Sequence, residues 1–77
     1  VEYKAINLSV LEDLAAKHNL TEITFETFVE AGFVSSKDKV KILGNGAITR
    51  ALAVKANAFS KSAEAAIVAA GGSIEKL

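Results

Sequence analysis

Polar and apolar side chains alternate from Tyr3 to Leu8, which predicts a short strand at the start of the chain. Apolar residues then recur three or four positions apart. This spacing indicates a first helix over residues 10–18, with Asn19 as its stop. Ser9 and Glu12 have the spacing of a capping box, in which each side chain bonds the other residue's backbone N–H. The opening segment is therefore expected to be a strand followed by a capped helix.

A second, shorter helix is predicted to begin at Thr24, a residue type that caps helix starts well. Gly32 is expected to end it in the left-handed conformation, which residues with a side chain resist. Phe33 and Val34 should then return to the core before a turn over residues 35–38.

The middle of the chain predicts two strands. Val40 and Ile42 alternate with lysines, which is typical of a strand with one exposed face. The triplet Gly44, Asn45 and Gly46 contains the residue types that tight hairpin turns require, so a hairpin is expected there. Residues 48–55 would form its returning strand.

The last third of the chain predicts a helix and a strand. Ser60 is expected to cap a third helix with a narrow, alanine-rich apolar stripe, and Gly71-Gly72 to stop it. Residues 73–77 then form a short final strand. The fold class is α+β: a single domain over residues 1–77 in which short strands alternate with three helices.

Composition limits the kinds of interaction that can stabilise such a fold. It has 77 residues, of which 51% are hydrophobic, and it has no cysteine. Disulfides are thus excluded, no metal-ligand spacing is present, and the core has to come from aliphatic packing. The absence of an initial Met indicates a piece of a longer protein. No apolar run is long enough for a membrane span, so a membrane partner is not expected.

Catalytic signatures are almost absent. The one histidine, His18, lies in the last turn of an acidic helix, where it favours contact with the negative helix end over catalysis. No motif places a serine as a nucleophile, and no metal site is indicated. We therefore expect a chain without enzymatic activity, catalytic residue, cofactor or small-molecule substrate.

Charge is unevenly distributed, although nine cations balance nine acids. Residues 1–38 carry three lysines and seven acids, whereas residues 39–62 carry five cations and no acid. Taken alone, such a run favours a solvated surface over a binding patch. The acidic half leaves a second hypothesis open, in which the surface from Glu12 to Glu30 docks a basic protein.

The segment 55–62 joins cations and short hydrogen-bonding side chains to a predicted helix start, where free N–H groups attract anions. An ordinary capped helix with lysines in water fits the pattern equally well. If the basic stretch binds RNA, the candidate contacts are Lys39, Lys41, Arg50, Lys55, Asn57, Ser60, Lys61 and Ser62.

The run KILGNGAITRALAVKANAFSKSAEAAIVAAGG, residues 41–72, resembles the signature region of bacterial ribosomal large-subunit protein fifteen. A lysine and two aliphatics precede a Gly-x-Gly turn, and Val-Lys-Ala, Phe-Ser, an alanine-rich helix and Gly-Gly follow. The matching residues are Lys41, Ile42, Leu43, Gly44, Gly46, Val54, Lys55, Ala56, Phe59, Ser60, Ala63, Ile67 and Gly71.

The resemblance implies a globular domain of irregular strand–strand–helix turns that is a structural constituent of the ribosome. It implies large-subunit ribosomal RNA and neighbouring ribosomal proteins as partners, support of subunit assembly, and a cytoplasmic location in the ribosome. This chain would be the C-terminal part of such a protein, monomeric when isolated. The basic N-terminal extension typical of the family is absent from it.

Overall fold

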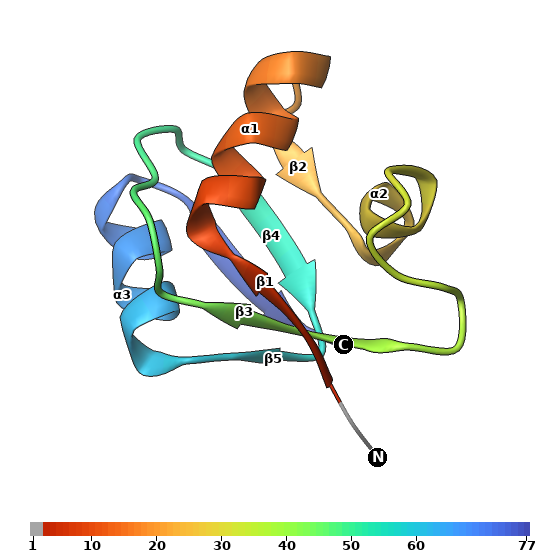
Figure 1. The fold of residues 1–77 in the computed structure, drawn as a ribbon. Helices are drawn as coiled ribbons and strands as arrows, with labels where there is room; N and C mark the ends of the chain where they lie inside the picture. Colours follow the sequence, from red (N-terminus) through yellow and green to blue (C-terminus); the bar gives the residue numbers. More distant parts are fainter. Residues whose placement is uncertain (1–2) are drawn as a thin grey trace.

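The chain winds back and forth between two small parallel sheets (Figure 1). The structure is a computed structural model and describes residues 3–77. One sheet has the strand order β1-β3-β5 and the other β2-β4-β6. In chain order the elements are β1 (Tyr3–Asn7), α1 (Leu8–His18), β2 (Glu22–Ile23), α2 (Phe25–Glu30), β3 (Lys39–Leu43), β4 (Ala53–Ala56), β5 (Ala58–Phe59), α3 (Lys61–Ala69) and β6 (Ser73–Lys76).

Each turn of this winding contributes one strand to each sheet. The first turn is β1-α1-β2, the second is β3, a loop over residues 44–52, and β4, and the third is β5-α3-β6. Tyr3 pairs with Lys39 in one sheet, and Ala53 pairs with Ser73 in the other. The predicted α+β class and the irregular strand–strand–helix turns are therefore confirmed.

The core lies inside this winding and is mainly aliphatic, as the composition predicts, with Phe28 as a fully buried aromatic side chain. Alternation along each strand sends one set of side chains inward, and α1 and α3 add their apolar stripes. Within residues 3–77 no polar or charged side chain is buried. The buried side chains are Ile6, Leu8, Leu11, Leu14, Ala15, Ile23, Phe28, Val34, Val40, Ile42, Leu52, Val54, Ala56, Ala63 and Ile67.

The predicted helix ends are mostly confirmed. Asn19 ends α1 in the left-handed region, with φ 54°. Thr24 caps α2 through a reciprocal pair of hydrogen bonds with Thr27. Gly32 follows α2 with φ 84°, and Ser60 accepts a hydrogen bond from the third backbone N–H after it at the start of α3. These signals depend on a few neighbouring residues, which is why the sequence reveals them.

The predicted capping box at the first helix is wrong. The helix begins at Leu8, two residues earlier than expected, so Ser9 and Glu12 lie within it. Asn7 occupies the cap position and makes no side-chain capping hydrogen bond. Burial of Leu8 in the core carries the helix back to the end of β1. The Glu12 carboxylate is thereby released for another contact, described below.

The predicted hairpin around Gly44–Gly46 is also wrong, because among residues 3–77 no strand pairs with the strand next to it in sequence. β3 pairs with β1 and β5, whereas β4 pairs with β2 and β6, and all pairs are parallel. Residues 44–52 therefore form a loop between sheets, and only residues 53–55 of the expected returning strand lie in a strand, as part of β4.

Close packing explains the two glycines of that loop. A Cβ on Gly44 would lie 2.7 Å from the Ser62 Cβ, and one on Gly46 would lie 2.9 Å from the Ser9 backbone nitrogen. Gly46 also has φ 90°, a conformation that disfavours side chains. The loop thus needs glycine where it passes the starts of α3 and α1, not for a hairpin turn.

Two further details differ from expectation. Val34 is buried as predicted, but Phe33 is 45% exposed. The two-residue strands β2 and β5 have too little sequence to show alternation and were not predicted. No helix in the described part of the chain is long and apolar enough to cross a membrane.

Candidate nucleic-acid interface

The outer face of the β1-β3-β5 sheet is open to solvent and carries two lysines. Val40 and Ile42 point into the core, so Lys39 and Lys41 point outward from the same strand, about 7 Å apart along it. On this face Tyr3, Ala5 and Lys39 are exposed, and Lys41 and Ala58 are partly exposed. We call it the basic sheet face, formed by Tyr3, Ala5, Lys39, Lys41 and Ala58, which pair across the three strands.

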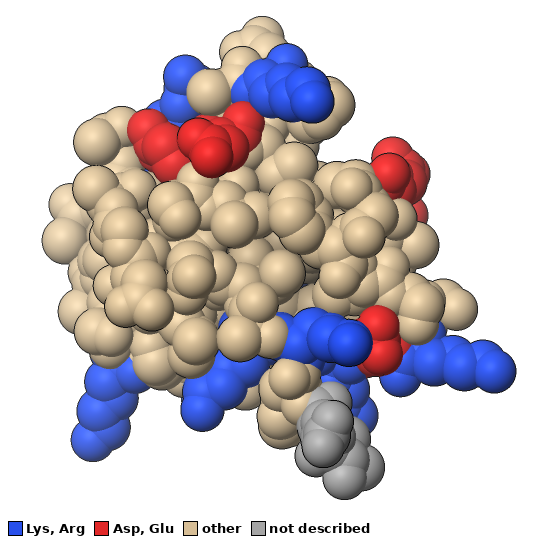
Figure 2. All heavy atoms as spheres, viewed as in Figure 1, with Lys and Arg blue, Asp and Glu red and all other residues tan. Residues whose placement is uncertain are grey.

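Small neighbours leave these lysines accessible. Lys41 lies between Ala5 on β1 and Ala58 on β5, and Lys39 lies beside Tyr3, whose side chain is 47% exposed. Lys61, the first residue of α3, is exposed just beyond the end of β5. Figure 2 shows lysine and arginine side chains along the lower side of the molecule, where β3 and β5 lie in Figure 1.

The structure separates the five cations of the basic stretch, residues 39–62, by whether a carboxylate lies beside them. Lys55 lies 3.5 Å from Glu22, and Arg50 lies 3.9 Å from Glu12. Such exposed pairs are weak, about 0–1 kcal/mol, but they reduce the charge offered to a polyanion. Among residues 3–77, Lys39, Lys41 and Lys61 have no carboxylate within ion-pair distance. Glu2, one of the acids counted above, lies outside the described residues.

Two of the polar candidates hold the fold together. Asn57 connects β4 to β5, and its Oδ1 accepts a hydrogen bond from the backbone N–H of Val40 at 2.8 Å. Ser60 Oγ accepts from the backbone N–H of Ala63 at 3.2 Å, which caps α3. Ser62 is exposed beside it, and the two hydroxyl oxygens lie 3.3 Å apart.

Sequence reasoning missed two lysines near the same strand. Lys4 on β1 is exposed and pairs in register with Val40, and Lys37 is exposed just before β3. Both lysines belong to residues 1–38, the acidic half of the sequence. Their closeness to β3 could not be predicted, because the parallel pairing of β1 with β3 has no local signal in sequence. Asp38 lies close by; its pKa is below the ordinary value of 3.8, chiefly through the backbone N–H of Ser35 and also through Lys4.

Glu12 anchors the loop over residues 44–52 to α1. Its carboxylate accepts hydrogen bonds from the Thr49 hydroxyl at 2.6 Å and from the Thr49 backbone N–H at 3.1 Å. These bonds, the hydroxyl's first, hold the pKa of Glu12 below its ordinary value of 4.5. The loop therefore passes α1 with its backbone fixed at Thr49, and Arg50 lies beside the Glu12 carboxylate.

The arrangement is suited to binding anions. Lysine ammonium groups on an open sheet act as point charges toward phosphate, and Tyr3 adds a hydroxyl that can bond phosphate or sugar oxygens. Phe59 is partly buried against the core. Among the described residues, no three acidic, histidine or cysteine side chains are grouped closely enough to hold a metal ion.

Comparison with known proteins gives a consistent result. Residues 5–75 match the profile of a family described as ribosomal proteins 50S-L15 and 50S-L18e with their 60S counterpart. Relatives named large ribosomal subunit protein uL15 are 61% identical in Bacteroides thetaiotaomicron and 58% identical in Porphyromonas gingivalis strain W83, each over 77 residues. The relative from Azobacteroides pseudotrichonymphae is 47% identical over 74 residues, which is 96% of this chain and 49% of the relative.

The first two of these matches cover the whole chain but only 52% of each relative. The chain therefore spans about half the length of the curated relatives that it matches. The profile match, in contrast, extends over nearly all of the chain, from the first strand to the last. The chain belongs to the family of ribosomal proteins 50S-L15 and 50S-L18e and their 60S counterpart.

Proposed function

We propose that the chain is a structural, non-catalytic constituent of the cytoplasmic ribosome that packs against large-subunit ribosomal RNA. The observation that carries this proposal is the open basic sheet face, on which Lys39 is exposed and Lys41 partly exposed, with Lys61 at its border. Membership of a ribosomal protein family supports the identity of the polyanion.

The groups on this face suit contact with RNA. An A-form duplex has a wide, shallow minor groove that displays 2′-hydroxyls, and surface side chains can contact these hydroxyls and the phosphates. Lys39 and Lys41 would contact phosphates, while Tyr3 would bond a 2′-hydroxyl or a phosphate oxygen. Ala5 and Ala58 leave room for close approach.

The other candidates take supporting roles in this proposal. Lys61 and Ser62 extend the contact surface at the start of α3, where free N–H groups also favour anions. Asn57 and Ser60 fix the backbone beside it, and Arg50 and Lys55 contribute less because carboxylates lie beside them. Base-specific contacts are not required for such packing.

The proposal includes a longer protein, since the curated relatives are about twice the length of this chain. A basic N-terminal extension would hold this globular C-terminal part at the RNA and raise its effective concentration there. By itself the domain is expected to be monomeric and to bind RNA weakly. Neighbouring ribosomal proteins are further expected partners.

A titration of the isotope-labelled chain with a large-subunit RNA duplex tests the proposal. Amide signals on β1, β3 and the start of α3 should shift, and Lys41→Glu should weaken binding by about tenfold. Lys17→Glu, which makes the same charge change on α1, is the matched control and should have a much smaller effect. Equal losses for the two variants would show that charge alone, and not this face, governs binding.

A further inference from the structure

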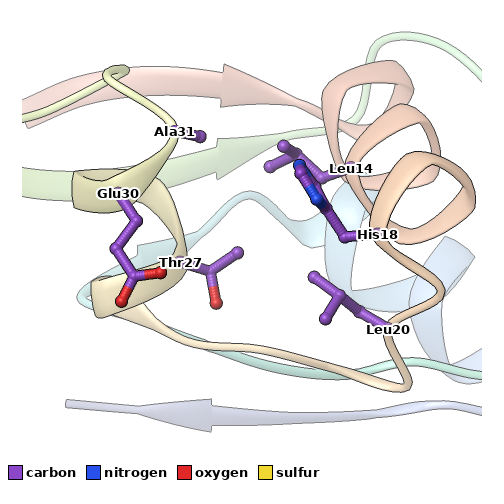
Figure 3. A pocket seen from close by; sticks show the side chains of 6 residues that line it. All are labelled: Leu14, His18, Leu20, Thr27, Glu30 and Ala31. Atoms are coloured by element: carbon purple, nitrogen blue, oxygen red, sulfur yellow. The ribbon is translucent and has the colours of Figure 1, made fainter.

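A groove separates α1 from α2, far from the strand that carries Lys39 and Lys41. It consists of two adjoining hollows of about 310 and 450 Å³ that share Leu14, His18, Glu30 and Ala31. Figure 3 shows Leu14 and His18 projecting from α1 toward α2. We call this feature the α1–α2 groove.

The lining of the groove is mainly apolar. Val10 and Leu14 line it from α1, and Leu20 lines it just after that helix. Phe33 completes one end and is 45% exposed, although its neighbour Val34 is buried. An exposed aromatic ring beside an apolar hollow is the kind of anchor on which binding energy concentrates.

The border of the groove is acidic. Asp13 and Glu30 line it, and Glu26 is exposed on the same short helix as Glu30. Among residues 3–77, none of these three carboxylates lies within ion-pair distance of a cation. Lys17 supplies a single positive charge, and His18 lies inside the hollow. The border is therefore net negative.

We propose that the α1–α2 groove binds a cationic segment of another protein through an apolar side chain of that segment. The apolar side chain would insert between Leu14 and Phe33, and flanking lysines or arginines would lie beside Asp13 and Glu30. The argument is charge complementarity, since the same carboxylates repel phosphate and make RNA an unsuitable occupant. This contact does not depend on RNA binding by the basic sheet face.

A short peptide of lysine and serine with one central leucine is the probe. Added to the isotope-labelled chain, it should shift the amide signals of Leu14, Ala31 and Phe33. A matched peptide with serine in place of leucine should bind at least about fivefold more weakly, because it loses the buried side chain. Equal binding of the two peptides would overturn the proposal.

Substitutions locate the contact. Phe33→Ser should lower the affinity of the chain for the leucine peptide by about fivefold or more. Val68→Ser, at a position 55% exposed on α3, should leave that affinity unchanged. Neither side chain belongs to the buried core, so both variants should fold, and thermal unfolding checks that each does so at the titration temperature. If both substitutions weaken binding equally, or neither does, the groove is not the site.

Charge reversal supplies an independent test. Glu30→Lys should lower the affinity for the leucine peptide by about tenfold. Glu64→Lys makes the same charge change on α3, away from the groove, and should leave that affinity nearly unchanged. RNA duplex added in place of the peptide should leave the groove amides unshifted. Shifts of Leu14 and Phe33 with RNA would instead make the groove part of the RNA surface and overturn the assignment to a protein partner.

Discussion

At the scale of single residues, Asn57 replaces part of a strand ladder. Its backbone N–H donates to the Val40 carbonyl at 3.1 Å, and its side-chain Oδ1 accepts from the Val40 N–H at 2.8 Å. One residue thus satisfies both backbone polar groups of Val40 at the corner between β4 and β5. A role in the fold accounts for an asparagine that the sequence alone places among RNA contacts.

Asn57→Ala should lower the free energy of unfolding by about 1–2 kcal/mol, because it leaves the partly buried Val40 N–H without an acceptor. Asn57→Asp keeps a side-chain oxygen at that position and should retain most of the stability. Urea unfolding measures both losses, and hydrogen exchange at the Val40 amide reports the bond itself. Similar losses for the two variants would contradict an acceptor role.

Two glycines with positive φ allow steric contact to be separated from backbone strain. Gly32→Ala meets no atom within 4 Å, so it should cost only the strain of φ 84°, about 1 kcal/mol. Gly46→Ala adds a contact of 2.8 Å with the Ser9 Cβ to a similar strain, and should cost about 2–3 kcal/mol. Thermal unfolding of both variants checks the order, and a larger loss for Gly32→Ala would refute it.

At the scale of elements, the helices were predictable and the strand pairing was not. Thr24 and Ser60 identify helix starts because their side chains bond N–H groups three residues away. The pairing of β1 with β3 depends instead on residues far apart in sequence, and Gly44-Asn45-Gly46 resembles a hairpin turn closely enough to mislead. Local chemistry is visible in one sequence, whereas parallel register is not.

The hydrogen bonds of Glu12 with Thr49, which join α1 to the loop over residues 44–52, should make stability depend on pH. Folding lowers the pKa of Glu12 below 4.5, so its contribution to stability is present above that value and is lost as the pH falls through the folded-state pKa. Glu12→Gln should therefore flatten the decline in stability on acidification. Asp38, whose pKa is also lowered, maintains the remaining slope.

Thr49→Val removes the hydroxyl that contributes most to lowering the pKa of Glu12 and should flatten the same profile, though less than Glu12→Gln. Unfolding monitored by circular dichroism from neutral pH down to about pH 3 measures each profile. Unchanged profiles in both variants would show that this contact does not form in solution.

At the scale of the whole molecule, the fold mixes charges that the sequence places in two separate halves. Two of the five predicted cations lie beside carboxylates, while Lys4 from the acidic half lies next to the basic strand β3. Among residues 3–77, Lys39 and Lys41 have no carboxylate within ion-pair distance, whereas Arg50 and Lys55 lie beside Glu12 and Glu22. The sequence alone could not separate these cations, because which acid lies beside which cation depends on the fold.

The salt dependence of RNA binding should reflect this reduced set. Five phosphate contacts would give a slope of log K against log salt of about −4, whereas three contacts, from Lys39, Lys41 and Lys61, give about −2 to −3. Lys41→Gln should reduce the magnitude of the slope by about 0.7–0.9, and Arg50→Gln should change it little. Fluorescence titrations at several salt concentrations measure both. A larger change for Arg50→Gln would move the contact surface away from β3.

The alternation of strands between two sheets also governs how the chain can acquire its structure. Tyr3 finds its partner only when Lys39 is present, and Ala53 finds one of its partners only when Ser73 is present. Strands that are consecutive in sequence therefore cannot pair to form an early folding nucleus. Large loops have to close before hydrogen bonds between paired strands can form. During synthesis the first strand emerges long before its partner, so sheet formation should begin only after the second winding has left the exit tunnel.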